Sequence, residues 1–313
     1  MLVTGPRTLS DEVLPLLAQI ALTPDYLLTQ VFNGLVNGGF YALLALGLSI
    51  IFGMLRIVNF AHGVMYMLGA FVAYYGAQYV HLPFFAALIV APLLVGAFGL
   101  AIEVLLLRRL YGIDPLYNLL FTFALVLMIE DLMRMAAGAL GSPYETPALL
   151  AGAANLGFTL YPVYRLFVIV VCVAVCAAVY VAIERSPLGA RIRAATEKPE
   201  LTRAFGIDTS RLVSGVFAFG VALAAFAGVL NAPNTNVAPN MGDAIIINTF
   251  AIVVIGGLGS ILGSVVAGFA LGVIAAVGSV LYPPISNTLI FIVMVLVILF
   301  RPAGLFGTTE RSA

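Results

Sequence analysis

Nine long apolar runs, separated by short polar segments, constrain this chain more than any other feature of its sequence. Most of them approach about 20 residues, the length of an α-helix that crosses a bilayer. Lipid offers no partners to backbone N–H and C=O groups, so such runs must form helices. The pattern predicts an all-α fold, a polytopic integral membrane helical bundle with about 8–9 transmembrane helices and a cytoplasmic helix. The runs are residues 27–52, 65–80, 84–107, 116–136, 165–184, 213–232, 244–257, 265–281 and 285–300.

Composition excludes most soluble functions. Hydrophobic residues make up 63% of the 313 residues and charged residues only 9%, whereas soluble domains carry about 25% charge. The 14 basic and 14 acidic side chains balance, so the basic excess of a nucleic-acid-binding surface is absent. The sequence has no phosphate-binding loop and no zinc-protease or Ser-His-Asp pattern, so we expect no catalytic residues and no ATP site in this chain.

Metal binding is also not expected. The two cysteines, Cys172 and Cys176, lie four residues apart inside one apolar run, and the two histidines are His62 and His81. Four such residues, scattered in this way, do not form the ligand set of a structural metal site. We interpret both cysteines as buried free thiols.

The charge distribution divides and orients the chain. Residues 1–26 are predicted to form an N-terminal segment with a short surface helix, since Asp11, Glu12 and Pro15 do not suit a signal peptide. Residues 27–302 form the transmembrane domain, and 303–313 form a cytoplasmic tail. The loop 184–212 holds six of the fourteen basic residues, so the positive-inside rule places it in the cytoplasm. Because successive spans cross the membrane in alternate directions, the stretches 137–164 and 231–240 are then predicted to lie outside the cell membrane.

Two segments of the membrane domain must turn. The run 244–281 is too long to cross a bilayer once, and the cluster Gly256 to Ser260 is the predicted turn. Small residues every fourth position, from Gly256 to Gly272, favour close helix packing, with a binding role as the alternative. The segment 52–64 is either a cytoplasmic turn, which gives nine spans, or a break within one span, which gives eight; Arg56 favours the turn.

The cytoplasmic loop is predicted to contain a two-turn helix. Thr196 can cap it, Pro199 suits its first turn, and Gly206 can end it in a left-handed conformation. Leu201 and Phe205, with Ala204, would form a small apolar patch. A soluble partner could receive this patch in a groove, or the loop could rest on the lipid surface.

Polar side chains inside the apolar runs are candidates for a transport pathway, because lipid penalises them unless they face a cavity or a partner. For the asparagines of the first run the alternative is tight helix packing, and for the histidine it is a structural hydrogen bond. Glu103 is expected to pair with the Arg108–Arg109 end of its helix, and Arg134 with Glu130 or Asp131. The candidates are Asn33, Asn37, Tyr41, Asn59, His62, Asn248 and Thr249.

The sequence resembles the permease subunits of branched-chain amino acid ABC transporters, the H-type subunit in particular. The resemblance is strongest in the stretch 33–63, which ends in Asn-Phe-Ala-His-Gly at 59–63. It continues through 65–70, the cytoplasmic loop and Val-Ile-Gly-Gly-Leu-Gly-Ser-Ile-Leu-Gly at 254–263. It covers about residues 30–302 and implies a multi-pass protein of the bacterial inner membrane.

The resemblance also implies partners and a role for the cytoplasmic loop. The partners are ATP-binding subunits, which hold ATP and Mg, a second permease subunit of the M type, and a periplasmic substrate-binding protein. Membrane lipid surrounds the chain, which has no cofactor of its own. The loop resembles the coupling motif that docks on the ATPase. The coupling residues carried over are Glu197, Pro199, Glu200, Leu201, Arg203, Ala204, Phe205, Gly206 and Ile207.

The cargo stays open at this stage. Amino-acid permeases usually continue with further basic residues after the Arg108–Arg109 pair, whereas this chain reads Leu-Tyr-Gly-Ile-Asp-Pro-Leu at 110–116. Relatives of the resembled family also handle amides, urea and aromatic acids. A stand-alone secondary transporter or channel for a small polar solute is the alternative function, and it would need ionisable groups at the membrane midplane.

Overall fold

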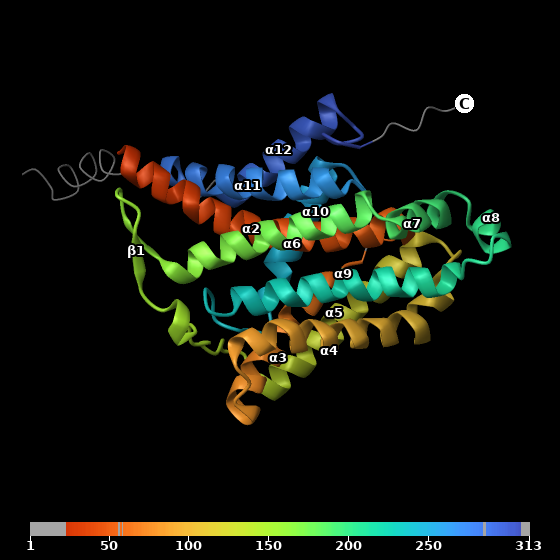
Figure 1. Cartoon of the computed structure of the whole chain (residues 1–313), viewed down its shortest axis with the longest axis horizontal. Coiled ribbons are helices and arrows are strands. Elements are labelled where there is room, and N and C mark those ends of the chain that lie inside the picture. The colour runs from red at the N-terminus through yellow and green to blue at the C-terminus, as the bar shows by residue number, and fades with distance from the viewer. Residues whose placement is uncertain (1–22, 56, 58, 284–285, 308–313) are drawn as a thin grey trace, which may run out of the picture.

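The computed structural model describes residues 23–55, 57, 59–283 and 286–307, so the expected surface helix within 1–26 lies almost wholly outside the described residues. Nine helices of the described chain form the bundle, and two short helices, α7 (Pro187–Glu197) and α8 (Pro199–Ala204), lie at one end of it (Figure 1). The bundle helices are α2 (Pro24–Leu55), α3 (His62–Val80), α4 (Phe84–Leu105), α5 (Pro115–Ala137), α6 (Val163–Glu184), α9 (Thr209–Asn231), α10 (Met241–Gly256), α11 (Ile261–Leu281) and α12 (Ser286–Phe300).

The apolar runs predicted from the sequence coincide with these helices, which confirms the polytopic helical fold. Five segments are long and apolar enough to cross a membrane by themselves. The shorter α10 and α12 belong to the same bundle. The five segments are Pro24–Leu55, Phe84–Leu110, Val163–Glu184, Thr209–Asn231 and Ile261–Val280.

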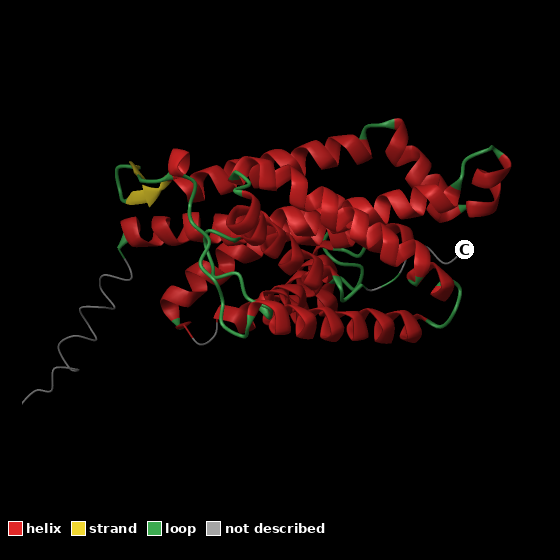
Figure 2. Cartoon of the chain, turned by 90° about the horizontal axis from the view of Figure 1, so that it is seen from below, coloured by secondary structure: helices red, strands yellow, loops and turns green. Residues whose placement is uncertain are grey.

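The long helices run side by side along the length of the molecule, so the bundle has two distinct ends. The end at the right of Figure 1 carries α7 and α8. The opposite end carries a hairpin of β1 (Ala153–Asn155) and β2 (Leu160–Pro162), in which Ala154 pairs with Tyr161, and Figure 2 shows the same separation from below. The positive-inside rule predicts that the arginine-rich α7–α9 end faces the cytoplasm. We call it the inner end and the hairpin end the outer end.

The chain turns inside the bundle between α2 and α3. Nε2 of His62, the first residue of α3, donates to the Leu44 carbonyl at 3.1 Å, so α3 begins beside the middle of α2. The connecting residues Ile57, Asn59 and Ala61 are buried, which is the condition for irregular backbone at membrane depth. The chain reverses direction across 52–64, since α2 runs from Asn33 at the outer end to Gly53 beside Gly259 at the inner end, whereas α3 runs back outward. The described residues therefore match a turn rather than a break within one span, with α3 starting inside the bundle; Arg56 itself lies outside them.

A second interior start lies directly beside the first. The Cβ of an alanine at Gly63 would lie 2.6 Å from the Gly242 carbonyl oxygen, so the first turns of α3 and α10 are in backbone contact. From there α3 runs to the outer end, where Phe84 after it packs on Tyr144 at 6.4 Å between ring centroids. By contrast, α10 runs to the inner end and stops at Gly256, where Gly257 takes a φ of 105°. The predicted turn at 256–260 is therefore confirmed.

Helices α2 and α11 make the most extensive contact in the bundle, and small residues make it possible. A Cβ at Gly272 would lie 2.4 Å from the Gly38 Cα, and one at Gly268 would lie 2.7 Å from the Ala42 Cα. These two helices therefore touch backbone to backbone, as small residues allow within membranes. For Gly268 and Gly272, the prediction that the small residues at every fourth position serve close helix packing is therefore confirmed.

Candidate functional site

The inner end presents a short helix with an exposed apolar surface. Helix α8 begins after Lys198, with Pro199 in its first turn, and Gly206 follows it with a φ of 82°. Left-handed backbone of this kind favours glycine, which ends the helix as predicted. Leu201 is 53% exposed and Phe205 is 85% exposed. These two apolar side chains therefore lie open on the surface of the inner end.

Two details of the predicted loop helix were wrong. Thr196 does not cap α8; it lies within the preceding helix α7, and its hydroxyl donates to the Ile192 carbonyl at 2.9 Å. Helix α8 has six residues rather than two full turns, because Pro199 restricts the residue before it and separates it from α7. Helix α7 itself was not predicted; Ser186 caps it through the Leu188 N–H at 3.1 Å.

The proposed coupling residues follow one another around this helix. Glu197 ends α7, Pro199 opens α8, and Phe205 to Ile207 form the link toward α9. Arg203 turns back from α8, and its Nε donates to the Thr209 hydroxyl at 2.7 Å. This bond ties α8 to the first residue of α9. Pro199, Glu200, Leu201, Arg203 and Ala204 are the exposed members within α8.

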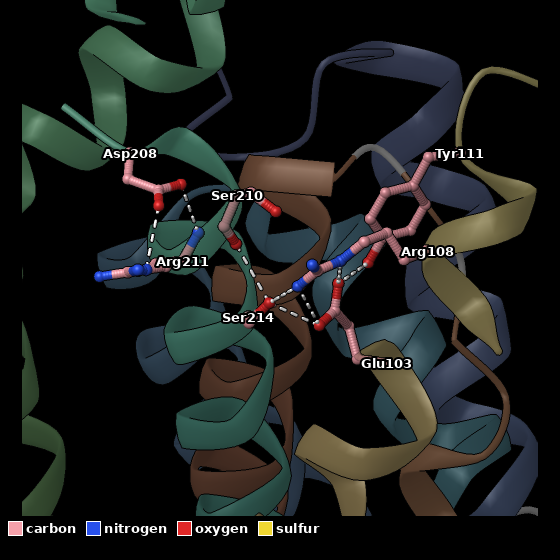
Figure 3. Close-up of polar contacts among 7 residues, drawn as sticks. All are labelled: Glu103, Arg108, Tyr111, Asp208, Ser210, Arg211 and Ser214. Carbon is pink, nitrogen blue, oxygen red and sulfur yellow. Dashed lines mark hydrogen bonds and ion pairs between the residues drawn. The ribbon is translucent and has the colours of Figure 1, made fainter. Parts of the chain in front are cut away.

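A polar network continues from α9 to the neighbouring helix α4 (Figure 3). Glu103 of α4 is fully buried and pairs with Arg108 at 3.2 Å. Ser214 of α9 donates to Glu103 Oε2 at 2.6 Å and also contacts the Arg108 guanidinium. The predicted Glu103–Arg108 ion pair is thus confirmed. The network around it also includes Ser214 of α9, which the sequence did not indicate.

Tyr111 closes this network from the loop after α4. Its hydroxyl donates to Glu103 Oε1 at 3.1 Å. Burial and the Glu103 charge raise the pKa of Tyr111, so the phenol stays protonated and acts as the donor at neutral pH. Beside the network, Asp208 caps α9 by accepting from the Arg211 N–H at 3.1 Å and pairs with the Arg211 side chain at 3.0 Å.

The outer end contains a polar pocket of about 340 Å³ between α2, α6, α9 and α11. Asn33 and Asn37 of α2, both pathway candidates, line it. Asn37 is exposed although most residues around it in α2 are buried or half-buried, which is the expected state of a side chain facing a polar cavity. The complete lining is Gln30, Asn33, Val36, Asn37, Arg165, Asn231, Asn234, Thr235, Ala276 and Ser279.

The other pathway candidates lie elsewhere in the bundle. Tyr41 and Asn248 bond to each other, with 3.2 Å between the Asn248 amide nitrogen and the Tyr41 hydroxyl. Thr249 is buried, and its hydroxyl donates to the Ile245 carbonyl at 2.6 Å. His62 makes the structural bond to Leu44. Asn59 is buried with both amide atoms unpartnered among the described residues.

Sequence reasoning missed the charged residue of the outer pocket. Arg165 stands in the first turn of α6, and its Nη1 donates to Asn33 Oδ1 at 3.0 Å. Tyr161 of the hairpin donates to the same oxygen, also at 3.0 Å. Burial raises the pKa of Tyr161, so its hydroxyl keeps the donor proton. A lone arginine at the start of a strongly apolar run was the signal that could have identified this position.

Two further expectations concern charges and thiols. Arg134 pairs with Asp131 at 3.3 Å, and Glu130 is instead buried. Cys172 and Cys176 are free and buried, as predicted. The described residues contain no group of three or more His, Cys, Asp or Glu side chains that could hold a metal ion.

A polytopic helical bundle with a polar pocket at its outer end and a short exposed helix at its inner end has the architecture of a membrane transport protein. Residues 30–299 match the family model described as the permease component of branched-chain amino acid transport systems. The chain belongs to this family. It is therefore a transport subunit rather than an enzyme.

Similar proteins agree with this assignment along nearly the whole chain. The chain is 30% identical to the high-affinity branched-chain amino acid transport system permease protein BraD of Pseudomonas aeruginosa, across 90% of this chain and 96% of BraD. It is 29% identical to LivH of Escherichia coli, across 91% and 97%. A probable LivH of Methanocaldococcus jannaschii is 25% identical, across 90% and 92%. No solved structure gives a significant match.

Proposed function

We propose that this chain is one transmembrane subunit of an ABC importer that carries branched-chain amino acids across the bacterial inner membrane. The family match and the relatives BraD and LivH support this cargo. In this proposal separate subunits bind ATP and Mg, an M-type permease completes the membrane channel, and a periplasmic binding protein delivers the amino acid. The family match does not favour a stand-alone transporter.

The single observation that carries the coupling role is the exposed surface of α8. Phe205 projects at the inner end, 85% exposed, in a segment that the Arg203–Thr209 bond ties to α9. Such an aromatic side chain, directly after the end of a helix that is tied to α9, has the features of an interface anchor. The proposed occupant is a groove on the ATP-binding subunit, into which α8 inserts.

Motion of α8 can then reach the membrane helices through the contacts already described. Arg203 joins α8 to Thr209 of α9, and Ser214 joins α9 to the Glu103–Arg108 pair of α4. Helices linked in this way move as one body rather than independently. When ATP closes the partner subunits, α8, α9 and α4 would shift together and change access to the pathway.

The test is a Phe205→Ala variant in the complex assembled from all of its subunits. We expect co-purification of the ATP-binding subunit to weaken at least about tenfold, since interface anchors contribute about 2 kcal/mol or more. Uptake of leucine, isoleucine and valine should fall in parallel. Phe306→Ala is the matched control, because Phe306 is also a partly exposed phenylalanine outside the proposed docking helix.

The outcomes separate the parts of the proposal. Equal assembly of both variants would contradict the docking role of Phe205. Normal assembly of the wild type, with uptake of urea or short amides instead of amino acids, would leave the coupling role intact and show that the cargo is wrong. Recovery of the folded wild-type chain without any P-loop ATPase would support the stand-alone alternative.

A further inference from the structure

The outer pocket holds a positive charge that no described carboxylate neutralises. Arg165 makes no ion pair among the described residues; its side chain donates to Asn33 and also lies within hydrogen-bonding reach of the neutral Tyr161 hydroxyl. A guanidinium has five N–H donors in a planar fork. Contacts with the Asn33 and Tyr161 oxygens use only some of these donors, and the Arg165 side chain lines the pocket.

The other polar groups of the pocket add further donors. The Asn234 amide nitrogen is buried and has no hydrogen-bond partner among the described residues, although a buried amide donor normally finds one. Asn37 faces the pocket from α2 with its side chain exposed. The pocket lining includes no Asp or Glu. A cation together with free amide donors, and without a carboxylate, suits an anionic ligand.

We propose that Arg165 is a specificity-determining residue that receives the carboxylate of an incoming amino acid in the outer pocket. This inference rests on the proposed function, since it takes an amino acid as the cargo. The fork of Arg165 matches the two oxygens of a carboxylate, and Asn234 supplies a further donor. Val36 and Ala276 provide apolar lining for the side chain. The volume of about 340 Å³ lies within the range of small-molecule sites.

The first experiment compares uptake by the reconstituted complex with its ATP-binding subunits and binding protein. We expect Arg165→Gln to raise the KM for L-leucine about tenfold or more, as expected for the loss of a charge-assisted hydrogen bond, and Arg165→Lys to restore part of the affinity. L-leucinamide, which lacks the carboxylate, should compete poorly with the wild type. Arg134→Gln is the control, because Arg134 is an outer-end arginine in an exposed ion pair.

An unchanged KM in Arg165→Gln, or equal competition by leucine and leucinamide at the wild type, would overturn the inference. A lower Vmax with an unchanged KM would also overturn it, because that result indicates a structural role. If the wild type takes up no amino acid at all, the proposed cargo is wrong, and the second experiment decides on the anion site alone.

The second experiment measures the charge of the pocket without any cargo. A cysteine replaces Thr235, which lines the pocket and is exposed, and its reaction rates with anionic and cationic methanethiosulfonates are compared. The parent protein is the background, since Cys172 and Cys176 are buried. We expect the anionic reagent to be favoured and Arg165→Gln to reduce this preference several-fold. If the ratio of anionic to cationic reaction rates is the same with Arg165 and with Arg165→Gln, the pocket does not attract anions through Arg165.

A lipid phosphate has the same charge and could occupy the pocket instead of a free carboxylate. Vesicles of phosphatidylcholine alone, and vesicles with added phosphatidylglycerol, distinguish the two sources. If the ligand is the amino acid carboxylate, Arg165→Gln raises the KM in both. If the effect appears only with phosphatidylglycerol, the ligand is a lipid headgroup, and the specificity role is wrong.

Discussion

Two half-buried arginines at opposite ends of the bundle have different environments. Arg108 at the inner end is paired with fully buried Glu103 and contacts Ser214. Arg165 at the outer end contacts only neutral oxygens among the described residues. A charge satisfied within the protein holds structure together, whereas one left without a counter-charge beside a cavity attracts a ligand. This contrast is the reason for assigning them different roles.

Replacing Glu103 with glutamine tests the structural role of the inner network. The change leaves the Arg108 charge without its partner, so we expect the free energy of unfolding to fall by about 1–3 kcal/mol; this is less than for a fully buried pair because Arg108 is 36% exposed. Thermal unfolding of the purified chain in detergent measures it. Asp131→Asn, in an exposed ion pair, should cost about 0–1 kcal/mol. Equal losses would contradict the network.

At the scale of elements, the α2–α11 pair supports the rest of the bundle. Backbones in direct contact leave no room for a side chain at Gly38 or Gly272. The pair also forms two walls of the outer pocket, through Asn37 on α2 and Ser279 on α11. Its packing therefore sets the position of the pocket as well as the stability of the domain.

A Gly272→Ala substitution tests this contact. The added Cβ would lie 2.4 Å from the Gly38 Cα, so the helices must separate, and we expect a loss of about 1–3 kcal/mol. Gly215→Ala on α9 is the control, because nothing lies within 4 Å of its added Cβ; it should be neutral or stabilise the helix by up to about 1 kcal/mol. Similar unfolding temperatures for the two variants would contradict the packing.

At the scale of the whole molecule, two parts of the bundle are arranged in opposite directions. A long helix, an interior turn and a short helix occur in α2 and α3 and again in α9 and α10, and each set is followed by another long helix, α4 or α11. The helices α3 and α10 start side by side and run to opposite ends. Inverted arrangements of this kind place discontinuous helices at the membrane centre in many transporters.

Labelling from the two sides of the membrane checks the orientation of the whole molecule. Ala153 of the hairpin and Ala204 of α8 are both exposed alanines at opposite ends. With cysteine at each position in turn, an impermeant thiol reagent should modify Ala153→Cys in intact spheroplasts and Ala204→Cys only in inside-out vesicles. The reverse pattern would show that the positive-inside assignment is wrong.

The sequence predicted the helices well because the bilayer imposes a simple rule. An apolar run such as 84–107 can satisfy its backbone hydrogen bonds in lipid only as a helix. The structure has helix α4 over most of this run. The left-handed stop at Gly206 followed from local chemistry in the same way. The cap at Thr196 failed, since its hydroxyl had a nearer acceptor within α7. The site was only half predicted: Asn33 and Asn37 line the pocket, whereas Asn248 and Tyr41 satisfy each other.

The sequence by itself determined the membrane class, the positions of the spans and the position of the short helix α8, because each depends on the local pattern of apolar and charged residues. Only the tertiary structure decided that 52–64 returns into the bundle, that Ser214 reaches Glu103, and that Arg165 and Asn234 share a pocket with Asn33. Those relations join residues up to 201 positions apart, as Asn33 and Asn234 are. They depend on how the helices pack, and the hydropathy of a single helix does not determine which neighbour its polar face meets.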